Sequence, residues 1–286
     1  MTQIFAVVNR KGGVGKTTTA INLAHGLARQ LMDKSGEPTG HVLLIDLDPQ
    51  GNCSTSLGVE TGDAAISSLL MGEASAEEVI VSADRAEDGG PSRPNLFLIP
   101  ATDRLAETKL ALIANEAVSE VVSRMTRSGN RPVPIDQLLT TQLKHAGQVF
   151  DYIIIDCPPS LDALNNAVYQ FADAAIVPVK VDYLGAAGAV RHTRDILEAQ
   201  AEGIEIRVGL IVPTFVRKRQ VLAREVLSTL RETYGEDRVS EPIPSSVKLE
   251  ESPAASGGLT IFEYAPDTAP AKAYQALVER VHHGKI

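Results

Sequence analysis

The chain has 286 residues, of which 44% are hydrophobic and 22% charged, a composition typical of a globular protein large enough to bury a substantial core. With no tryptophan, 4% aromatic residues and a formal net charge of −9, it does not resemble a protein that coats nucleic acid, so any DNA contact should be local. Two cysteines are too few for a disulfide framework and no apolar run approaches the roughly 20 residues of a membrane span, which excludes secreted and membrane-spanning proteins and favours the cytoplasm.

Short apolar, β-branched segments alternate with helical patterns along the chain. Six of them are predicted as strands buried on both faces: 4–9, 41–46, 96–100, 152–156, 174–179 and 208–213. Between the first two, apolar residues from Ala20 to Leu31 recur every three or four positions, as in a helix. This alternation predicts an α/β fold with a doubly wound, mostly parallel sheet, helices on both faces, and ligands at the carboxyl ends of the strands.

The first predicted strand leads into NRKGGVGKTTT, residues 9–19, at the start of the first predicted helix. Glycines let such a loop approach phosphate groups, and its amides lie at the helix N-terminus, where the helix dipole favours anions. Lys16 takes the place of the P-loop lysine on the β and γ phosphates, and the next two hydroxyls are placed for Mg²⁺ and the α phosphate. The residues predicted to bind the nucleotide in this way are Gly12, Gly13, Val14, Gly15, Lys16, Thr17 and Thr18. The alternative is a glycine turn that only joins strand to helix, which the complete pattern in this context disfavours.

Acidic residues end two later strands. LLIDLDPQGN carries Asp46 and Asp48, which alternation along a strand would place on one face near the phosphates. YIIIDCPPS contains Asp156, which has the character of a Walker B carboxylate that holds Mg²⁺ through a bound water. Because oxygen ligands suit a hard cation, the sequence predicts a magnesium site formed by Thr17, Asp46 and Asp156. Taken singly, each aspartate could instead cap the turn after its strand.

No internal repeat and no long linker divides the chain, so residues 1–286 are expected to form a single domain, although the length alone would also allow two small ones. Two polar stretches rich in Gly, Pro and Ser, at 84–95 and 126–134, are interpreted as surface loops. A contact with a partner is the alternative for these loops.

Basic residues cluster late in the chain, in FVRKRQVLAREVLSTLR at 215–231. Arg217, Lys218 and Arg219 fall at the start of a predicted helix. Three cations there oppose the helix dipole, so we expect them to serve a ligand outside the helix. A run of solvated charges without a ligand is the alternative.

In their order, KGGVGKTT, LLIDLDPQGN and IIIDCPPS resemble the motifs of the deviant Walker A ATPases, most closely those of the ParA-type chromosome and plasmid partition ATPases. The resemblance extends to LIPATDRLAETKL (98–110), VPVKVDYLGAAG (177–188) and FEYAPDTAPAKAYQALVERV (262–281), so it covers nearly the whole chain. It implies an ATPase that uses ATP and Mg²⁺ and hydrolyses ATP weakly without its partner. Because the chain starts almost directly on its first predicted strand, the amino-terminal helix-turn-helix extension of larger relatives is not expected.

The resemblance also implies roles for individual residues. Lys11 matches the signature lysine of the family, which crosses the interface of a face-to-face homodimer and contacts the nucleotide of the other subunit. A second cation supplied in this way acts like an arginine finger. With Lys16 and Asp48 it is assigned to catalysis, Asp48 as the residue that positions or activates the attacking water, while Asp46 supports the metal from the outer shell. A solvated surface lysine is the alternative for Lys11.

Family members of this kind bind DNA without sequence specificity as ATP-bound dimers, in the cytoplasm and associated with the nucleoid. Arg219 matches the DNA-binding arginine of the family, and the implied DNA site comprises Arg217, Lys218, Arg219 and Lys248. Lys248 is the only cation of IPSSVKLEESP, where relatives tend to carry arginines, so weak DNA binding is expected. Hydrolysis is expected to be stimulated by a ParB-type centromere-binding protein, whose basic amino-terminal segment docks on the acidic dimer.

Three other functions share parts of this pattern. A MinD-like membrane-cycling ATPase ends in an amphipathic membrane helix, whereas AKAYQALVERVHHGKI has no bulky apolar cluster and little basic charge, so a packing helix and no membrane contact are expected. A metal-cluster carrier needs paired cysteine ligands, but Cys53 and Cys157 stand beside nucleotide motifs, and Cys157 is expected to be a packing residue. A non-hydrolysing DNA-binding scaffold would not need Lys16, Asp48 and Asp156 together.

Overall fold

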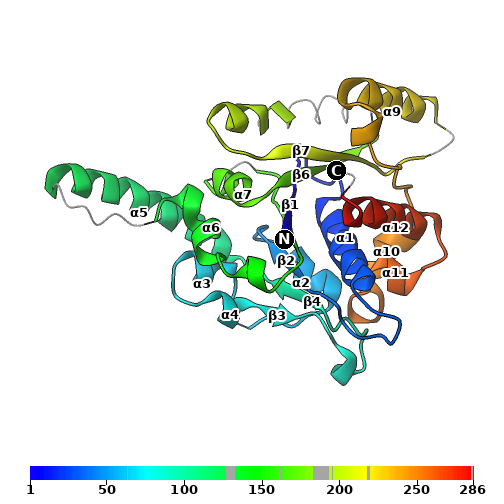
Figure 1. The fold of residues 1–286 in the computed structure, drawn as a ribbon, viewed down its shortest axis with the longest axis horizontal. Helices are drawn as coiled ribbons and strands as arrows, with labels where there is room; N and C mark the ends of the chain where they lie inside the picture. The colour runs from blue at the N-terminus through cyan, green and yellow to red at the C-terminus, as the bar shows by residue number, and fades with distance from the viewer. Residues whose placement is uncertain are drawn as a thin grey trace.

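A computed structural model gives the fold and describes residues 1–62, 64–126, 133–160, 163–182, 193–194, 196–217, 220–284 and 286, without the side chains of 120–126. Among these residues, seven strands form one sheet in the order β3-β4-β2-β5-β1-β6-β7 (Figure 1). All neighbouring strands are parallel except β3 and β4. The strands are β1 (Gln3–Val7), β2 (Val42–Asp46), β3 (Val81–Ser82), β4 (Leu96–Ile99), β5 (Tyr152–Asp156), β6 (Ala174–Lys180) and β7 (Arg207–Thr214). The sheet is therefore doubly wound and mostly parallel, as the sequence predicts.

The burial of the strands explains their sequences. The central strands β2 and β5 are buried along their whole length, which accounts for their continuous apolar runs. All six predicted strands are present within one or two residues of their expected ends. The sequence does not predict β3, because two residues that pair antiparallel at the edge of the sheet produce no periodic signal.

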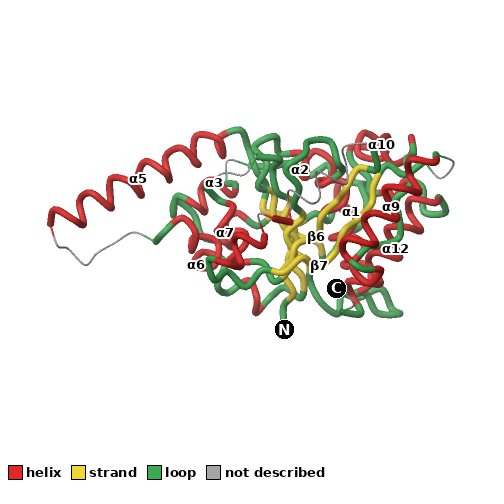
Figure 2. Tube along the Cα trace, turned by 90° about the horizontal axis from the view of Figure 1, so that it is seen from above, coloured by secondary structure: helices red, strands yellow, loops and turns green. Residues whose placement is uncertain are grey.

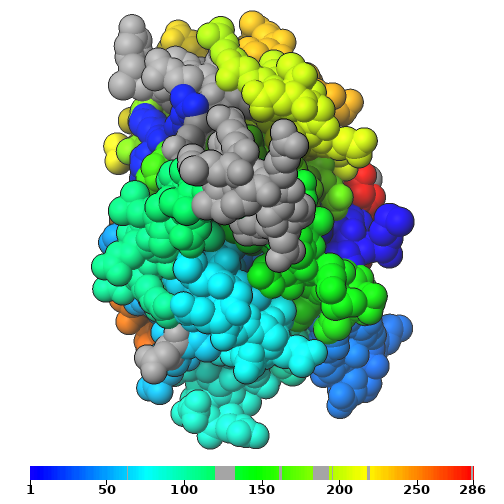
Figure 3. Space-filling model, turned by 90° about the vertical axis from the view of Figure 1, so that its left-hand side faces the viewer, coloured from blue at the N-terminus to red at the C-terminus, as the bar shows by residue number. Residues whose placement is uncertain are grey.

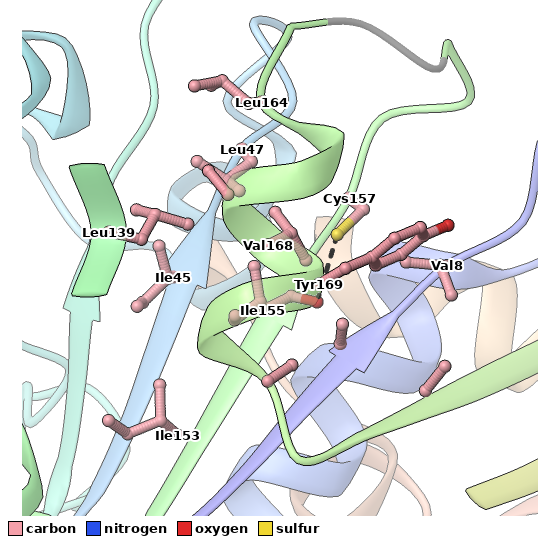
Figure 4. Close-up of a cluster of buried hydrophobic side chains, with 14 of the residues drawn as sticks. Val8, Ile45, Leu47, Leu139, Ile153, Ile155, Cys157, Leu164, Val168 and Tyr169 are labelled. Carbon is pink, nitrogen blue, oxygen red and sulfur yellow. Dashed lines mark hydrogen bonds between the residues drawn. The ribbon is translucent and has the colours of Figure 1, made fainter. Parts of the chain in front are cut away.

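Helices cover both faces of the sheet. Their bounds are α1 (Lys16–Gln30), α2 (Asn52–Leu57), α3 (Ile66–Leu70), α4 (Ala76–Val79), α5 (Arg104–Thr126), α6 (Leu138–Gln142), α7 (Asn165–Phe171), α9 (Val221–Tyr234), α10 (Val247–Glu251), α11 (Ile261–Tyr264) and α12 (Ala269–His282). Helices α3, α5, α6, α7 and α9 bury apolar side chains against one face, and α1, α2, α11 and α12 against the other. Figure 4 shows part of the first core, in which Ile155 of β5 lies beneath Val168 of α7. Cys157 is buried there as a packing residue, as predicted.

The C-terminal helix α12 is part of the second core. Its residues Tyr274, Leu277 and Val281 are at most 2% exposed, and the helix packs against α1. The apolar face of α12 is therefore used inside the chain, as expected of a packing helix. None of the helices in the described ranges is both long and apolar enough to cross a bilayer.

The prediction that 84–95 is a surface loop is wrong for its last residues. Arg93 and Asn95 are only 1% and 2% exposed. The Asn95 amide donates to the carbonyls of Ala28 and Gly40 over 2.9 Å each, and thereby joins the segment to the end of α1. Of the second loop, 127–132 lies outside the described residues, so its interpretation stays a prediction.

Candidate nucleotide-binding site

The loop between β1 and α1 has the backbone geometry of a phosphate cradle. Gly13 and Gly15 have φ values of 65° and 87°, in the left-handed region that residues with a Cβ rarely adopt. Gly15 is also the N-cap of α1, so the loop leads straight into the free amide groups of the helix N-terminus. From the end of β7, Thr214 donates its hydroxyl to the Val14 carbonyl over 2.8 Å and holds the loop from the side. The loop is thus ready for phosphate, and contact with each of its residues stays a prediction.

Two carboxylates meet beside this loop because two strands end in register. Asp46 of β2 pairs directly with Asp156 of β5, and both residues are fully buried. The carboxylate of Asp46 accepts backbone amides from Asp48 (2.9 Å) and Cys53 (3.0 Å). One oxygen of Asp156 lies 3.5 Å from the Cys53 thiol, which donates to it, while the other has no hydrogen-bond partner among the described residues. A buried oxygen without a partner is a signal that a ligand belongs there.

The pKa shifts of the buried charged groups also indicate a site for a ligand. Burial, with repulsion from Asp46, raises the pKa of Asp156, and burial raises the pKa of Asp46 against its backbone hydrogen bonds. Burial also lowers the pKa of Lys16, against the attraction of Asp156. Each group is therefore shifted toward its neutral form, and the binding of an ion of opposite sign would stabilise its charged form.

A magnesium ion fits the oxygen atoms at this position. Thr17 favours the charged form of Asp156, so a hydroxyl, a carboxylate with one oxygen unpaired among the described residues and a second carboxylate are grouped here. The ligand atoms of Asp46, Cys53 and Asp156 lie within 4.8 Å of one another. Hard cations prefer oxygen ligands, and a double positive charge would offset the repulsion between the two carboxylates.

Asp48 reaches the site by a different route from the one that strand alternation predicts. Because β2 ends at Asp46, Asp48 stands in the loop beyond the strand, partly exposed. Its carboxylate accepts the Gln50 amide over 3.1 Å and still acts on the charge of Lys16. A partly exposed carboxylate close to the phosphate loop is suited to orient a water molecule.

Lys11 stands at the rim of the loop and is held by its own chain. Its Nζ lies 3.0 and 2.9 Å from the two carboxylate oxygens of Asp182, just beyond β6, and its side chain is 32% exposed. Its backbone amide donates to the side chain of Asn9, which in turn donates to the Pro178 carbonyl. The Lys11 carbonyl accepts Lys16 Nζ over 3.3 Å. Sequence reasoning missed Asp182, although an acid directly after a buried strand was the available signal.

A small apolar pocket adjoins the phosphate loop and was not predicted either. Its volume is about 220 Å³, and its lining includes Gly15, Thr18, Phe215, Pro244, Ser245 and Leu249. Phe215 has a φ of 55°, unusual for a residue with a side chain, and a Cβ placed on Gly15 would lie 3.5 Å from its ring. A small, mostly apolar pocket next to the phosphate cradle suits a purine base.

The predicted DNA-binding residues are only partly described. α9 begins at Val221 with Gln220 as its N-cap, so Arg217 lies before the helix and not, as predicted, at its start. Arg217 is exposed in the loop before α9, whereas Lys218 and Arg219 lie outside the described residues. Lys248 on α10 is exposed and pairs with Glu251 over 3.3 Å. A bridge between Val216 and Pro244 brings the segments of Arg217 and Lys248 side by side.

The sequence is similar to those of curated proteins along nearly its whole length. An AAA domain family matches residues 2–207. The chain is 31% identical to the chromosome partitioning protein ParA of Caulobacter vibrioides, over 98% of this chain and 93% of that protein. It is 34% identical to the chromosome-partitioning ATPase Soj of Thermus thermophilus, over 96% of this chain and 94% of that protein.

A solved structure shares the fold. Cobyrinic acid a,c-diamide synthase from Mycobacterium smegmatis, with a bound ATP analogue and magnesium, superposes with a TM-score of 0.74 at 25% identity. The match covers 99% of this chain and 95% of that one. The fold, the phosphate loop and the carboxylate pair are therefore those of a P-loop protein that uses ATP with magnesium.

Proposed function

Because the chain belongs to the AAA-domain family of the ParA and Soj chromosome-partitioning ATPases, with ATP and Mg²⁺ as cofactors, we propose that it segregates DNA as an ATP-dependent homodimer. The ATP-bound dimer binds DNA without sequence specificity, and hydrolysis, stimulated by a ParB-type partner, releases it from the nucleoid. The observation that carries the proposal is a second lysine at the loop. Lys16 is buried inside it, while Lys11 stands partly exposed at its rim.

Within one subunit, the residues around the loop divide the work of phosphoryl transfer. The amides at the start of α1 and the ammonium of Lys16 bind the phosphates, and the buried position of Lys16 strengthens its interaction with them. Thr17, Asp46 and Asp156 would hold Mg²⁺, which would supply positive charge against the negative charge of the phosphates. Asp48, in its loop beyond β2, orients the attacking water. The products are ADP and phosphate.

Lys11 completes the site of the other subunit. To do so it must leave Asp182, and because both side chains are about one third exposed, water screens their attraction and separation requires little free energy. Once ATP brings two loops face to face, the Lys11 ammonium compensates charge that develops on the neighbour's transferring phosphoryl group. ATP then joins the two subunits.

The test of this proposal is the molar mass of the protein in solution with Mg²⁺ and ATP. In an Asp48→Ala background, which slows hydrolysis, we expect a dimer with ATP and a monomer with ADP. Lys11→Ala should keep ATP binding and lose the dimer, whereas Lys16→Ala should lose both. A Lys11→Ala protein that dimerises like its parent would show that Lys11 does not act across an interface.

We place the DNA surface at Arg217, Lys218, Arg219 and Lys248, where the loop before α9 runs beside the segment of α10. The support is the exposure of Arg217 and Lys248 and the bridge that joins their segments. Arg219→Glu should lose DNA retention and keep the ATP-dependent dimer. Arg238→Glu, an equally large charge reversal at an exposed residue near Arg207 at the start of β7, is the matched control and should change neither. Equal DNA retention by the two variants would show that the DNA-binding surface does not include Arg219.

A further inference from the structure

Helix α5 carries an apolar stripe that the described part of the chain leaves uncovered. Figures 1 and 2 show α5 extending away from the rest of the fold, and Figure 3 faces the side on which it projects. Leu110, Ile113 and Val118 are 69%, 47% and 62% exposed, and Ala114 and Ala117 beside them are exposed as well. These five residues occupy positions i, i+3, i+4, i+7 and i+8, which form one face of a helix. We call them the α5 stripe.

The α5 stripe is not needed to hold the helix in place. A second, inward face of α5 packs on the core through Leu105 and Leu112, both buried, and contacts α3. Further along, Glu116 accepts the backbone amide of Ile135 over 3.2 Å. A helix with one apolar face in the core and another in water is suited to bind a second molecule.

The charges around the α5 stripe indicate what that molecule is like. Asp103 and Glu107 are exposed at the N-terminal end of the stripe. A second copy of this chain would bring the same acids to the same stripe, and like charges would repel. A helix with an apolar face and basic flanks would match both the shape and the charge.

The inward face of α5 also touches the loop that carries Asp48. Lys109 is 7% exposed, and its Nζ donates to the Leu47 carbonyl over 3.4 Å. Leu47 directly precedes Asp48, and its amide donates to the Asp156 carbonyl over 2.9 Å. A small movement of α5 would therefore displace the backbone at Leu47, between Asp46 and Asp48.

We propose that the α5 stripe docks a basic amphipathic helix of the partner protein, and that Lys109 transmits its arrival to the loop of Asp48. The inference rests on the proposed function, because it assumes a partner that stimulates hydrolysis. It adds where that partner binds and which contact carries the signal. Lys109 is a positioning residue, since it acts through Leu47 rather than on the nucleotide.

Docking can be tested with a labelled 18-residue helical peptide of leucine on one face and lysine on the other, titrated with the full chain in Mg²⁺ and ATP. We expect the double variant Leu110→Gln, Val118→Gln to bind about tenfold more weakly. The matched control is Leu197→Gln, which removes a leucine that is 60% exposed elsewhere and should bind like the parent. Equal binding by the double variant and its parent, or equal binding of a leucine and glutamate peptide, would overturn the proposal. So would a changed molar mass of the double variant in ATP, because the stripe would then join two copies.

The link to Asp48 has its own readout, the rate of phosphate release with saturating peptide divided by the rate without it. We expect the peptide to accelerate release from the parent, and Lys109→Met to bind the peptide with unchanged affinity but to lose the acceleration. A peptide that binds the stripe without changing the rate would overturn the role of Lys109. Retention on DNA is measured in the absence of peptide, so failure of the proposed function appears there and not in the docking titration.

Discussion

Two buried polar clusters lie on the same molecule and differ in how completely their groups are paired. In the first, the Arg93 guanidinium makes two hydrogen bonds to Glu263, at 2.8 and 2.9 Å, and donates to the carbonyls of Leu57 and Gly258. In the second, Asp156 lies beside Asp46 with one oxygen unpaired among the described residues. The first cluster joins distant parts of the chain, whereas the second has an oxygen that a bound ion can pair with.

A structural polar network differs from a functional one in how many of its buried groups have hydrogen-bond partners. A buried charge with every hydrogen bond made stabilises a single arrangement, and a buried charge with a missing partner is retained for a reason other than stability. The pKa of Glu263 is lowered despite its burial, through Arg93 and His25, while burial raises the pKa of Asp156. Burial thus raises the pKa of a carboxyl group beside another acid, whereas neighbouring cations outweigh it at Glu263.

The largest expected effect is on the paired cluster. Arg93→Met should lower the free energy of unfolding by about 3–5 kcal/mol, because Glu263 is left partly buried without its cation. The measurement is urea unfolding of the nucleotide-free protein. Arg104→Met is the control, since its exposed pair with Glu73 should contribute less than about 1 kcal/mol. Equal losses in the two variants would contradict the distinction between the clusters.

The two clusters should also respond to pH in opposite directions. Burial lowers the pKa of His25 to about 4 from its ordinary 6.5, so only the unfolded chain binds this proton between those values. Compared with His25→Asn, the native protein should therefore lose about 3 kcal/mol of unfolding free energy between pH 7 and 4.

For the second cluster, the native state holds a proton on Asp156 that the unfolded chain releases above pH 3.8, because the pKa of this carboxyl is raised to about 8. The stability that comes from this protonated carboxyl is fully present below pH 3.8 and is lost as the pH rises toward 8. Compared with Asp156→Asn, the nucleotide-free protein should thus weaken over this range. Mg²⁺ with ATP should reduce the difference, and an unchanged difference would argue against the metal at Asp156.

Substitution of Asp156 should change stability and activity in opposite directions. Asp156→Asn removes a buried acid that has no full set of partners, so the nucleotide-free protein at pH 7 should become about 1–3 kcal/mol more stable. ATP turnover should fall about 10- to 100-fold, because the outer support of the metal is lost. Unfolding midpoints and phosphate release measure the two effects. A variant that is both less stable and fully active would contradict the assignment of Asp156 to function.

The smallest effect concerns Lys11. Asp182→Asn removes its partner in the same chain, and at this exposure the pair contributes less than about 1 kcal/mol to stability. Freed from Asp182, Lys11 should reach the neighbouring subunit more readily, so half-dimerisation in ATP should occur at a protein concentration about two- to fivefold lower. Sedimentation at several concentrations tests this. Glu73→Gln, which breaks a pair far from the loop, should leave the midpoint unchanged.

The sequence predicts the second cluster better than the first. Lys16, Asp46 and Asp156 lie in local motifs that follow strands, and strand order then brings them together without further information. Arg93 stands in a stretch that reads as a polar loop, and its burial depends on Glu263, 170 residues later in the chain. No local pattern contains such a contact.

The same limit explains the other omissions at the site. The pocket beside Gly15 depends on the backbone conformation of Phe215 and on the segment of Ser245, which approach only after the sheet has formed. Asp182 becomes significant only when β6 lies beside β1 and its carboxylate reaches Lys11. Residue type and spacing therefore predict the phosphate site, whereas tertiary contacts determine the apolar pocket beside Gly15 and the position of Lys11 against Asp182.

ATP-dependent DNA binding is tested by retention of the protein on DNA of arbitrary sequence in three states: with ATP, with ADP and without nucleotide. An Asp48→Ala variant holds the ATP state for the measurement. We expect retention with ATP alone, and loss of that retention as the salt concentration rises. If no nucleotide state is retained on DNA, or if all three are retained equally, the chain is not an ATP-dependent DNA-segregation dimer.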